Sequence, residues 1–209
     1  MLRFAVPVVC GVVSLFSATV LLIRAQPLRE NAAHAILQTD AGCEEPCWQG
    51  ILPGETTLEN ALAMLRAHPW TDEPGFFARI DAVGWTWTGV EPHYIDPRRR
   101  SILTVRSDGV VDGVILNTRV PLGDFILWLG QPDVLWVFPN QDYIAVYQSQ
   151  RLELRVHLRC PAFAADFWHA PVEVRWRYRL QQYDVFGAFP LDPNNEAWRE
   201  RAWRCSSVR

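Results

Sequence analysis

The sequence predicts an α+β fold, with an antiparallel sheet and helices packed on one face of it. Two amphipathic helical segments, within 56–69 and 120–132, are each followed by a proline and then by runs typical of strands. A run of strands after each helix favours segregated helices and an antiparallel sheet over a βαβ arrangement. The order helix, strands, helix, strands also suggests a tandem helix–strand duplication, with halves at 51–118 and 119–185.

The first helix is defined by its start, its apolar face and its stop. Thr56 is expected to cap it, and Glu59 completes a capping box three residues later. Pro69 ends it, because proline cannot continue a helix. One face carries apolar residues at helical spacing: Leu58, Ala61, Leu62 and Leu65.

Strand patterns dominate the rest. Segment 101–118 reads as a hairpin that turns at Asp108 and Gly109, and 79–89 alternates tryptophans with small residues. The second helix is expected to place Phe125, Ile126 and Leu129 on one face. Further strands are expected in 133–138, 143–148, 151–158 and 172–180. In the last, we expect Val172, Val174, Trp176, Tyr178 and Leu180 to point inward, and Glu173, Arg175, Arg177 and Arg179 outward.

The N-terminus predicts a membrane segment. Residues 4–23 are uncharged and, as a helix, match the thickness of a bilayer's hydrocarbon core. We therefore expect an anchor or signal segment at 1–24, a tether at 25–42 and one α+β domain at 43–209. An uncleaved anchor is favoured, because the sequence "LLIRAQ" after the apolar run fits a signal-cleavage site poorly; secretion after cleavage is the alternative.

The cysteines predict an oxidising environment. Cys43, Cys47, Cys160 and Cys205 lie outside the apolar segment, and an even number in an exported chain is typical of disulfides. We expect Cys43–Cys47 and Cys160–Cys205 pairs, although other connectivities remain open. The alternatives are a thiol-redox site at Cys43 and Cys47, or a zinc site in which His157 and Cys160 join them.

Two short stretches resemble a known family. "ILPGETTLENALAML", echoed by "VPLGDFILWLGQP", resembles the tandem repeats of the beta-lactamase-inhibitor-protein-like superfamily, which includes small outer-membrane assembly lipoproteins. Gly54, Thr56, Glu59 and Leu65 fit the first copy, and Gly130 and Pro132 fit the end of the second. The opening "CEEPCWQGILPGETT" also resembles uncharacterised exported bacterial proteins. The resemblance covers about residues 43–160 and implies an exported, non-catalytic binding or scaffold fold, with no functional residue carried over. "RAHPW" departs from the repeat's usual ending, and no lipobox is present.

Two features could meet a ligand. Arg98, Arg99 and Arg100 follow a proline in a loop and could contact an anionic headgroup or polymer, although such a loop is more often simply solvated. Trp70, Trp85 and Trp87 could form an aromatic ligand face, although alternating tryptophans on a strand usually face a core.

Several chemistries lack their residues. The chain has no lysine among its twenty basic residues, which excludes Schiff-base and P-loop lysines, and its net charge of −3 argues against nucleic acid. No G-x-S-x-G elbow or paired histidine motif is present. The sequence predicts an extracytoplasmic, membrane-tethered binding or structural module without catalysis, metal or cofactor, its partner a protein or polymer. The alternative is a cell-wall or carbohydrate-acting enzyme that uses Asp72, Glu73, Asp81 and Glu91.

Overall fold

The structure, a computed structural model, describes most of the chain after residue 31. The described residues are 16–17, 32–38, 43, 47–72, 74–76, 81–138, 142–158, 164–180 and 189–191. The chain divides into two compact units, Met1–Asn31 and Ala32–Arg209, and the sheet and the helices named below belong to the second. Within the described residues no helix is long and apolar enough to cross a membrane. The predicted span at 4–23 lies outside them, apart from residues 16–17, and stays a prediction.

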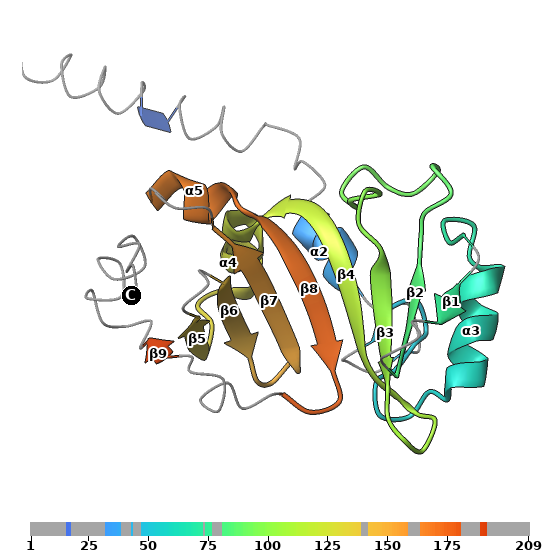
Figure 1. Cartoon of the computed structure of the whole chain (residues 1–209). Helices are drawn as coiled ribbons and strands as arrows, with labels where there is room; N and C mark the ends of the chain where they lie inside the picture. Colours follow the sequence, from blue (N-terminus) through green and yellow to red (C-terminus); the bar gives the residue numbers. More distant parts are fainter. Residues whose placement is uncertain are drawn as a thin grey trace, which may run out of the picture. The chain divides into compact units, whose positions relative to one another are not determined.

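Nine described strands form one sheet in which every neighbouring pair is antiparallel (Figure 1). Their order across the sheet is β1-β2-β3-β4-β8-β7-β6-β5-β9. This sheet and the short helices confirm the predicted α+β class. The strands are β1 (Gly75–Phe76), β2 (Ala82–Trp85), β3 (Ser101–Val105), β4 (Val111–Pro121), β5 (Val134–Val137), β6 (Asp142–Tyr147), β7 (Leu152–His157), β8 (Pro171–Arg177) and β9 (Phe189–Leu191).

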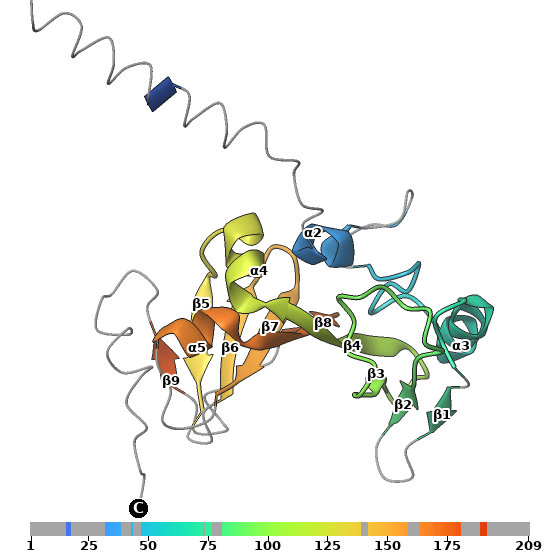
Figure 2. The ribbon, with the colours of Figure 1, turned by 90° about the horizontal axis from the view of Figure 1, so that it is seen from above.

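Two meanders meet in the middle of this sheet. The first runs from β1 to β4 and the second from β5 to β8, and the last strand of each pairs with the other (Figure 2). The predicted hairpin is confirmed, because β3 and β4 pair across a turn in which Gly109 has a φ of +79°. A positive φ is open to glycine because it has no Cβ.

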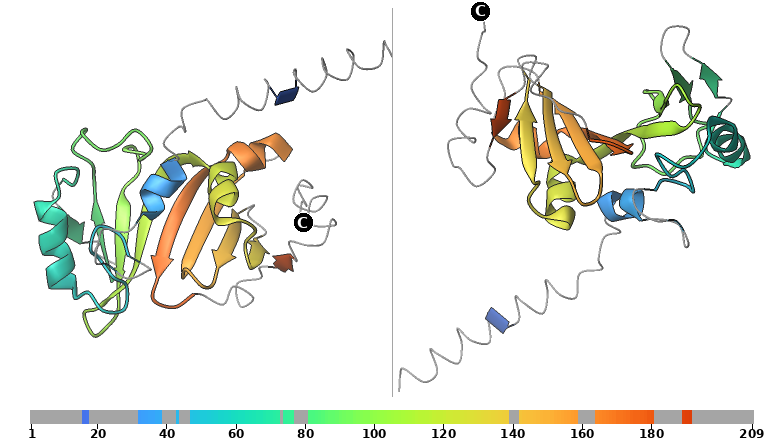
Figure 3. Two further views of the ribbon diagram at one scale, coloured as in Figure 1. Left: turned by 180° about the vertical axis from the view of Figure 1, so that it is seen from behind. Right: turned by 90° about the horizontal axis from the view of Figure 1, so that it is seen from below.

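The described helices are α2 (Ala32–Leu37), α3 (Leu58–Ala67), α4 (Leu122–Leu129) and α5 (Ala164–His169). α4 contacts α2, α5 and β4, and α2 lies beside it in the views of Figure 3. α3 lies at the end of the sheet that carries β1. Both predicted helices, α3 and α4, are confirmed.

Two boundaries differ from the sequence prediction. α3 is capped by Thr57, whose hydroxyl accepts from the Asn60 N–H, whereas the Thr56 hydroxyl accepts from the Leu52 N–H in the preceding turn. The Thr56 cap was therefore wrong by one residue, because two adjacent threonines offer equivalent hydroxyls and the turn takes the first. The compact unit also begins at Ala32, within the expected tether, because α2 buries Ala33 and Ile36 in the core.

One large apolar core lies against the sheet and holds α2, α3 and α4 to it. The buried residues of α3 are Ala61 and Leu65, and those of α4 are Leu122 and Phe125. Val174 and Trp176 point into the same core from β8, as predicted. A second, smaller cluster is centred on Ile144 and Val146 of β6. Because successive side chains of a strand alternate in direction, these two residues lie on the opposite face from Tyr143 and Ala145.

Candidate functional site

A polar cavity of about 870 Å³ lies where β6 begins, β7 ends, β8 begins and β4 bends toward α4. Its volume falls within the range of small-molecule sites, but its wall is far more polar than most of them. The charged and titratable residues that line the cavity, within the described part of the chain, are Asp96, Arg99, Asp142, Arg155, His157, Asp166, His169 and Glu173.

A bend in β4 places the loop that carries Asp96 and Arg99. The register between β4 and β8 shifts between Asn117 and Pro121, and the Thr118 hydroxyl donates to the Val172 carbonyl at 2.8 Å inside this irregularity. The Asn117 carbonyl accepts from the Asp96 N–H at 3.0 Å. A β-bulge of this kind frees backbone groups that a regular ladder would use, and here they bind the loop.

The same loop is closed by its own side chains. Asp96 accepts from the Arg98 N–H at 3.1 Å, and the Asn117 amide donates to the Arg100 carbonyl at 2.9 Å. The Arg99 guanidinium lies 4.0 Å from the Asp96 carboxylate and remains 66% exposed at the rim. Asp–Arg pairs of this exposure contribute little stability, so the contact between Arg99 and Asp96 costs little to break.

Asp142 is the buried centre of the wall. Its side chain is 4% exposed and receives the Arg155 guanidinium, whose Nε donates to Oδ2 at 3.1 Å. The His157 Nδ1 lies 2.8 Å from the other carboxylate oxygen. An ionised carboxylate only accepts hydrogen bonds, so this contact assigns the proton to Nδ1 and leaves Nε2 as the outer nitrogen of a half-exposed ring.

Strand register explains these contacts. Asp142 is the Cα partner of His157, and Arg155 is the partner of Glu173 on β8. Arg155 Nη1 lies 3.9 Å from Glu173, which also accepts from the Arg175 Nε at 2.6 Å. Carboxylates and guanidiniums thus alternate across three adjacent strands.

The helix α5 and the residues after it complete the wall. Asp166 and His169 come from α5, both exposed, and Ala170, Pro171 and Val172 lead into β8. The Ala170 carbonyl accepts from the Leu122 N–H at 3.0 Å, which fixes α5 to the start of α4.

Two tyrosines with raised pKa values lie on the other face of the sheet. Burial raises the pKa of Tyr143, and burial together with the negative charge of Asp133 raises that of Tyr147. Both tyrosines belong to the core. The described residues contain no group of three or more histidine, cysteine or carboxylate side chains placed to hold a metal ion.

The predicted arginine loop contributes one residue to this cavity. Arg98, Arg99 and Arg100 are all exposed, but only Arg99 lines the wall, and Arg100 is held there through its backbone. The predicted aromatic face is not an exposed surface at two of its three positions, because Trp85 and Trp87 are 1% and 8% exposed. Trp70 is half-buried and packs against the core.

The carboxylates beside the tryptophan strand make local bonds. The Thr86 hydroxyl donates to Asp72 at 3.2 Å, and Glu91 accepts from the Gly89 N–H at 2.8 Å. Asp81 is exposed, and Glu73 lies outside the described residues. None of the three described carboxylates lines the cavity.

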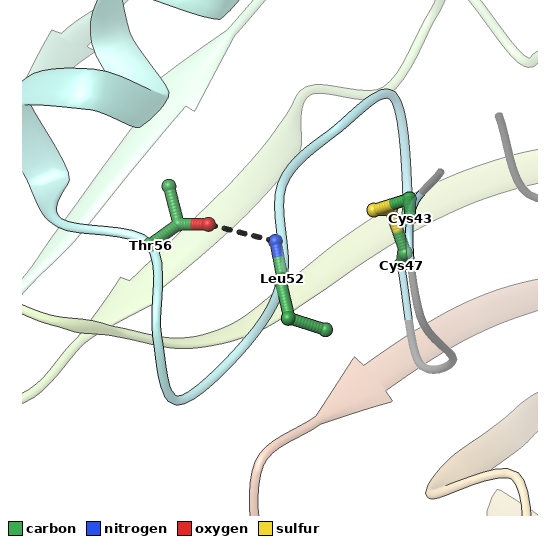
Figure 4. Close-up of a disulfide and its surroundings, with 4 residues drawn as sticks. All are labelled: Cys43, Cys47, Leu52 and Thr56. Carbon is green, nitrogen blue, oxygen red and sulfur yellow. Dashed lines mark hydrogen bonds between the residues drawn. A yellow bond between two sulfur atoms is a disulfide. The ribbon is translucent and has the colours of Figure 1, made fainter. Parts of the chain in front are cut away.

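A disulfide joins Cys43 and Cys47 ahead of α3 (Figure 4), as predicted. Cys47 is buried, and the next residue, Trp48, stacks on Trp85 with ring centroids 5.6 Å apart. The cross-link therefore leads directly into the core. While the two sulfurs are bonded to each other, they cannot act as zinc ligands. Cys160 and Cys205 lie outside the described residues.

Sequence reasoning missed most of the cavity wall. Asp142, Arg155 and Asp166 were not singled out, and His157 was weighed as a zinc ligand. A signal was present: 151–158 alternates Glu153, Arg155 and His157 with apolar residues. Such alternation is typical of an exposed strand face, so it did not distinguish a solvated face from a cavity.

Comparison with protein-family models, with curated proteins and with solved structures finds no significant match. The resemblance to the beta-lactamase-inhibitor-protein-like superfamily therefore stays a prediction.

Proposed function

We propose that this chain is an extracytoplasmic, membrane-tethered binding module whose cavity holds a ligand that carries a positively charged amine. The observation that carries the ligand class is the charge of the cavity wall. Among the described residues, four carboxylates line it, Asp96, Asp142, Asp166 and Glu173, against two guanidiniums, Arg99 and Arg155.

The carboxylates differ in what they can offer a ligand. Asp142 is engaged by Arg155 and His157, and Glu173 by Arg155 and Arg175. Asp166 is exposed on α5. The Asp96 carboxylate lies 4.0 Å from the Arg99 guanidinium at the rim of the cavity. A cationic ligand therefore reaches the wall at its exposed carboxylate, Asp166, while the ion pairs of Asp142 hold the buried part of the wall in place. Electrostatic complementarity of this kind favours a cation over its neutral analogue.

The cellular setting comes from the sequence. The uncharged segment 4–23 supports a tether, and the Cys43–Cys47 disulfide supports an oxidising compartment. We further propose that the helices cover one face of the sheet and that the two meanders arose by duplication. The equivalent positions of β4 and β8, each the last strand of its meander, support the duplication.

The test compares ligands whose amine is either charged or neutralised by acetylation. Titration calorimetry on the full-length chain in mild detergent would use glucosamine hexamer against N-acetylglucosamine hexamer. A lysine peptide and its acetyl-lysine form provide a second pair. We expect the charged member of at least one pair to bind, and added salt to weaken it. Equal binding of charged and acetylated members, or binding of neither, would contradict the proposal.

Variants locate the binding. Asp166→Asn is expected to weaken the charged ligand about fivefold, which corresponds to roughly 1 kcal/mol. Asp108→Asn is the matched control, because Asp108 is an exposed carboxylate paired with Arg106 at the β3–β4 hairpin and does not line the cavity. Equal losses in both variants would indicate a general effect of net charge rather than a site.

A second candidate function follows from the Asp142–His157 contact. A buried carboxylate that fixes the Nδ1 proton of a half-exposed histidine is the arrangement of a general base. The described residues that line the cavity include no serine or cysteine, and the Thr118 hydroxyl is bonded to the Val172 carbonyl, so such an enzyme would activate water. His157 would accept the water's proton as the water oxygen bonds to an amide carbonyl carbon of a cell-wall peptide. The C–N bond would then break as that proton passes from His157 to the leaving amine. The test is incubation of the chain with cell-wall fragments, followed by mass spectrometry. The second function requires a cleavage product that forms with the unsubstituted chain and is absent with His157→Ala.

A further inference from the structure

Three large apolar side chains form an exposed ridge on α4 and α5. Leu127 is 85% exposed, Trp128 50% and Trp168 38%, and we call these three residues the apolar ridge. Single exposed apolar residues are common on protein surfaces. Two tryptophans and a leucine on helices that contact each other are a patch, and such patches mark interaction surfaces.

The ridge is continuous because α5 packs where α4 has no side chain. A Cβ on Gly123 would lie 3.2 Å from the Trp168 carbonyl oxygen and 3.7 Å from its ring atom Cε3. Gly123 and Leu127 are four residues apart, so they share one face of α4. Leu127 therefore continues the surface that the Trp168 ring begins.

The apolar ridge also contacts α2, the first described helix of the second compact unit. The Trp128 ring meets the His34 ring of α2 with centroids 4.3 Å apart. α2 begins at Ala32, and the predicted membrane span ends at Ile23. Residues 24–31 join them, and eight residues reach at most about 28 Å when fully extended. The predicted anchor and α2 are therefore only eight residues apart in the chain.

We propose that the apolar ridge inserts into the interfacial region of the lipid bilayer. This inference rests on the membrane tether of the proposed function. Tryptophan is the side chain most typical of that region, since its ring is apolar and its N–H remains hydrated. The charged residue within α4 is Asp124, which gives the helix no attraction to anionic lipids. Binding is thus driven by apolar burial, and uncharged phosphatidylcholine suffices.

The ridge orients the bound domain. α5 carries Trp168 next to His169 and two residues after Asp166, and both neighbours line the polar cavity. Seating α5 at the interface would hold the rim of the cavity within reach of ligands at the membrane surface.

Lipid-borne quenchers test the proposal. The full-length chain is reconstituted into phosphatidylcholine vesicles, with or without bromine on the acyl chains near the headgroup, and tryptophan emission is measured. No tryptophan occurs in residues 1–31, so quenching reports the rest of the chain. We expect brominated lipid to lower the emission, and Trp128→Phe/Trp168→Phe to lose at least half of that quenching. Trp70→Phe is the matched control, because Trp70 is also part-exposed but packs near α3.

Flotation of the vesicles separates this inference from the proposed tether. A chain that does not float with vesicles overturns the tether and the inference together. A chain that floats, but whose quenching is absent or unchanged by the double variant, leaves the tether standing and overturns the ridge. Leu127→Glu adds a second readout: it should lower quenching while flotation stays unchanged. Ridge-dependent cross-linking between copies without lipid quenching would assign the ridge to a protein interface instead, and would also overturn the inference.

Discussion

The ion pair between Glu153 and Arg177 should be the most sensitive charged contact of the fold. Glu153, on β7, is 0% exposed, and the Arg177 side chain on β8 is 9% exposed. The Arg177 Nε donates to the Glu153 carboxylate at 3.0 Å. Sequence alternation predicted that Arg175 and Arg177 point away from the main core and into solvent. They do point away from the main core, but exposure to solvent was wrong, because both residues are more than nine-tenths buried.

The expected cost of breaking this pair follows from its burial. Removing one partner of a buried ion pair costs about 3–5 kcal/mol, because it leaves an uncompensated charge away from water. In Glu153→Leu the ion pair that remains for Arg177 among the described residues is with Asp112 at 3.9 Å, and Asp112 is partly exposed. We therefore expect a loss of about 3 kcal/mol in the free energy of unfolding. Glu153→Leu/Arg177→Met removes both charges and should return to within about 1 kcal/mol of the unsubstituted chain.

Urea unfolding of the full-length chain in detergent, followed by tryptophan fluorescence, measures these differences. Arg106→Met provides the control, because it breaks an exposed pair with Asp108 and should cost less than about 1 kcal/mol. The reasoning is refuted if Glu153→Leu costs no more than Arg106→Met. It is also refuted if the double variant is as unstable as the single one, since the loss would then come from packing.

Three further predictions concern the backbone, a helix cap and alkaline pH. Gly54→Ala should destabilise the fold by about 2–4 kcal/mol, because Gly54 has a positive φ of +93° and a Cβ there would clash with the Tyr178 ring. Gly75→Ala is the control: a Cβ on Gly75 would meet open space, so it should cost less than about 0.5 kcal/mol in the same urea assay. Thr57→Ala should cost about 1 kcal/mol through the lost cap of α3, and Thr57→Ser should restore most of it; equal melting temperatures for both would contradict the cap. The pKa of Tyr147 in the folded chain is raised above its ordinary value of 10.0, so its contribution to the free energy of unfolding is complete below pH 10 and is lost as the pH rises above 10. The urea midpoint should therefore fall between about pH 9 and 11, and less steeply in Tyr147→Phe. Because the chain has no lysine, lysine ammonium groups do not titrate in that range.

The regular elements could be predicted because their signals are local. α3, α4 and the β3–β4 hairpin each follow from residues adjacent in the chain: an apolar face at helical spacing, a glycine at the stop of α4, and Asp108 with Gly109 at the turn. The cap of α3 was placed one residue early, because adjacent threonines compete for the same backbone donors and only the turn geometry selects between them.

The cavity could not be predicted, because its residues come from segments far apart in the chain. Asp96 and Asn117 meet through a bulge in β4, whereas Asp142 and His157 meet through strand register. A bulge and a register depend on how strands pair, and the alternation of a single strand is the same for a solvated face as for a cavity wall.

The amino-acid sequence by itself determined the composition of each element and the direction of its side chains relative to one another. It also placed two cysteines close enough in the chain to pair as a disulfide. Only the tertiary structure decided which polar faces are enclosed. It buried Glu153 with Arg177 and gathered Asp96, Asp142, Asp166 and Glu173 around one hollow. The physical reason is that alternation fixes which side of a strand a residue occupies, whereas burial depends on what the rest of the chain places against that side.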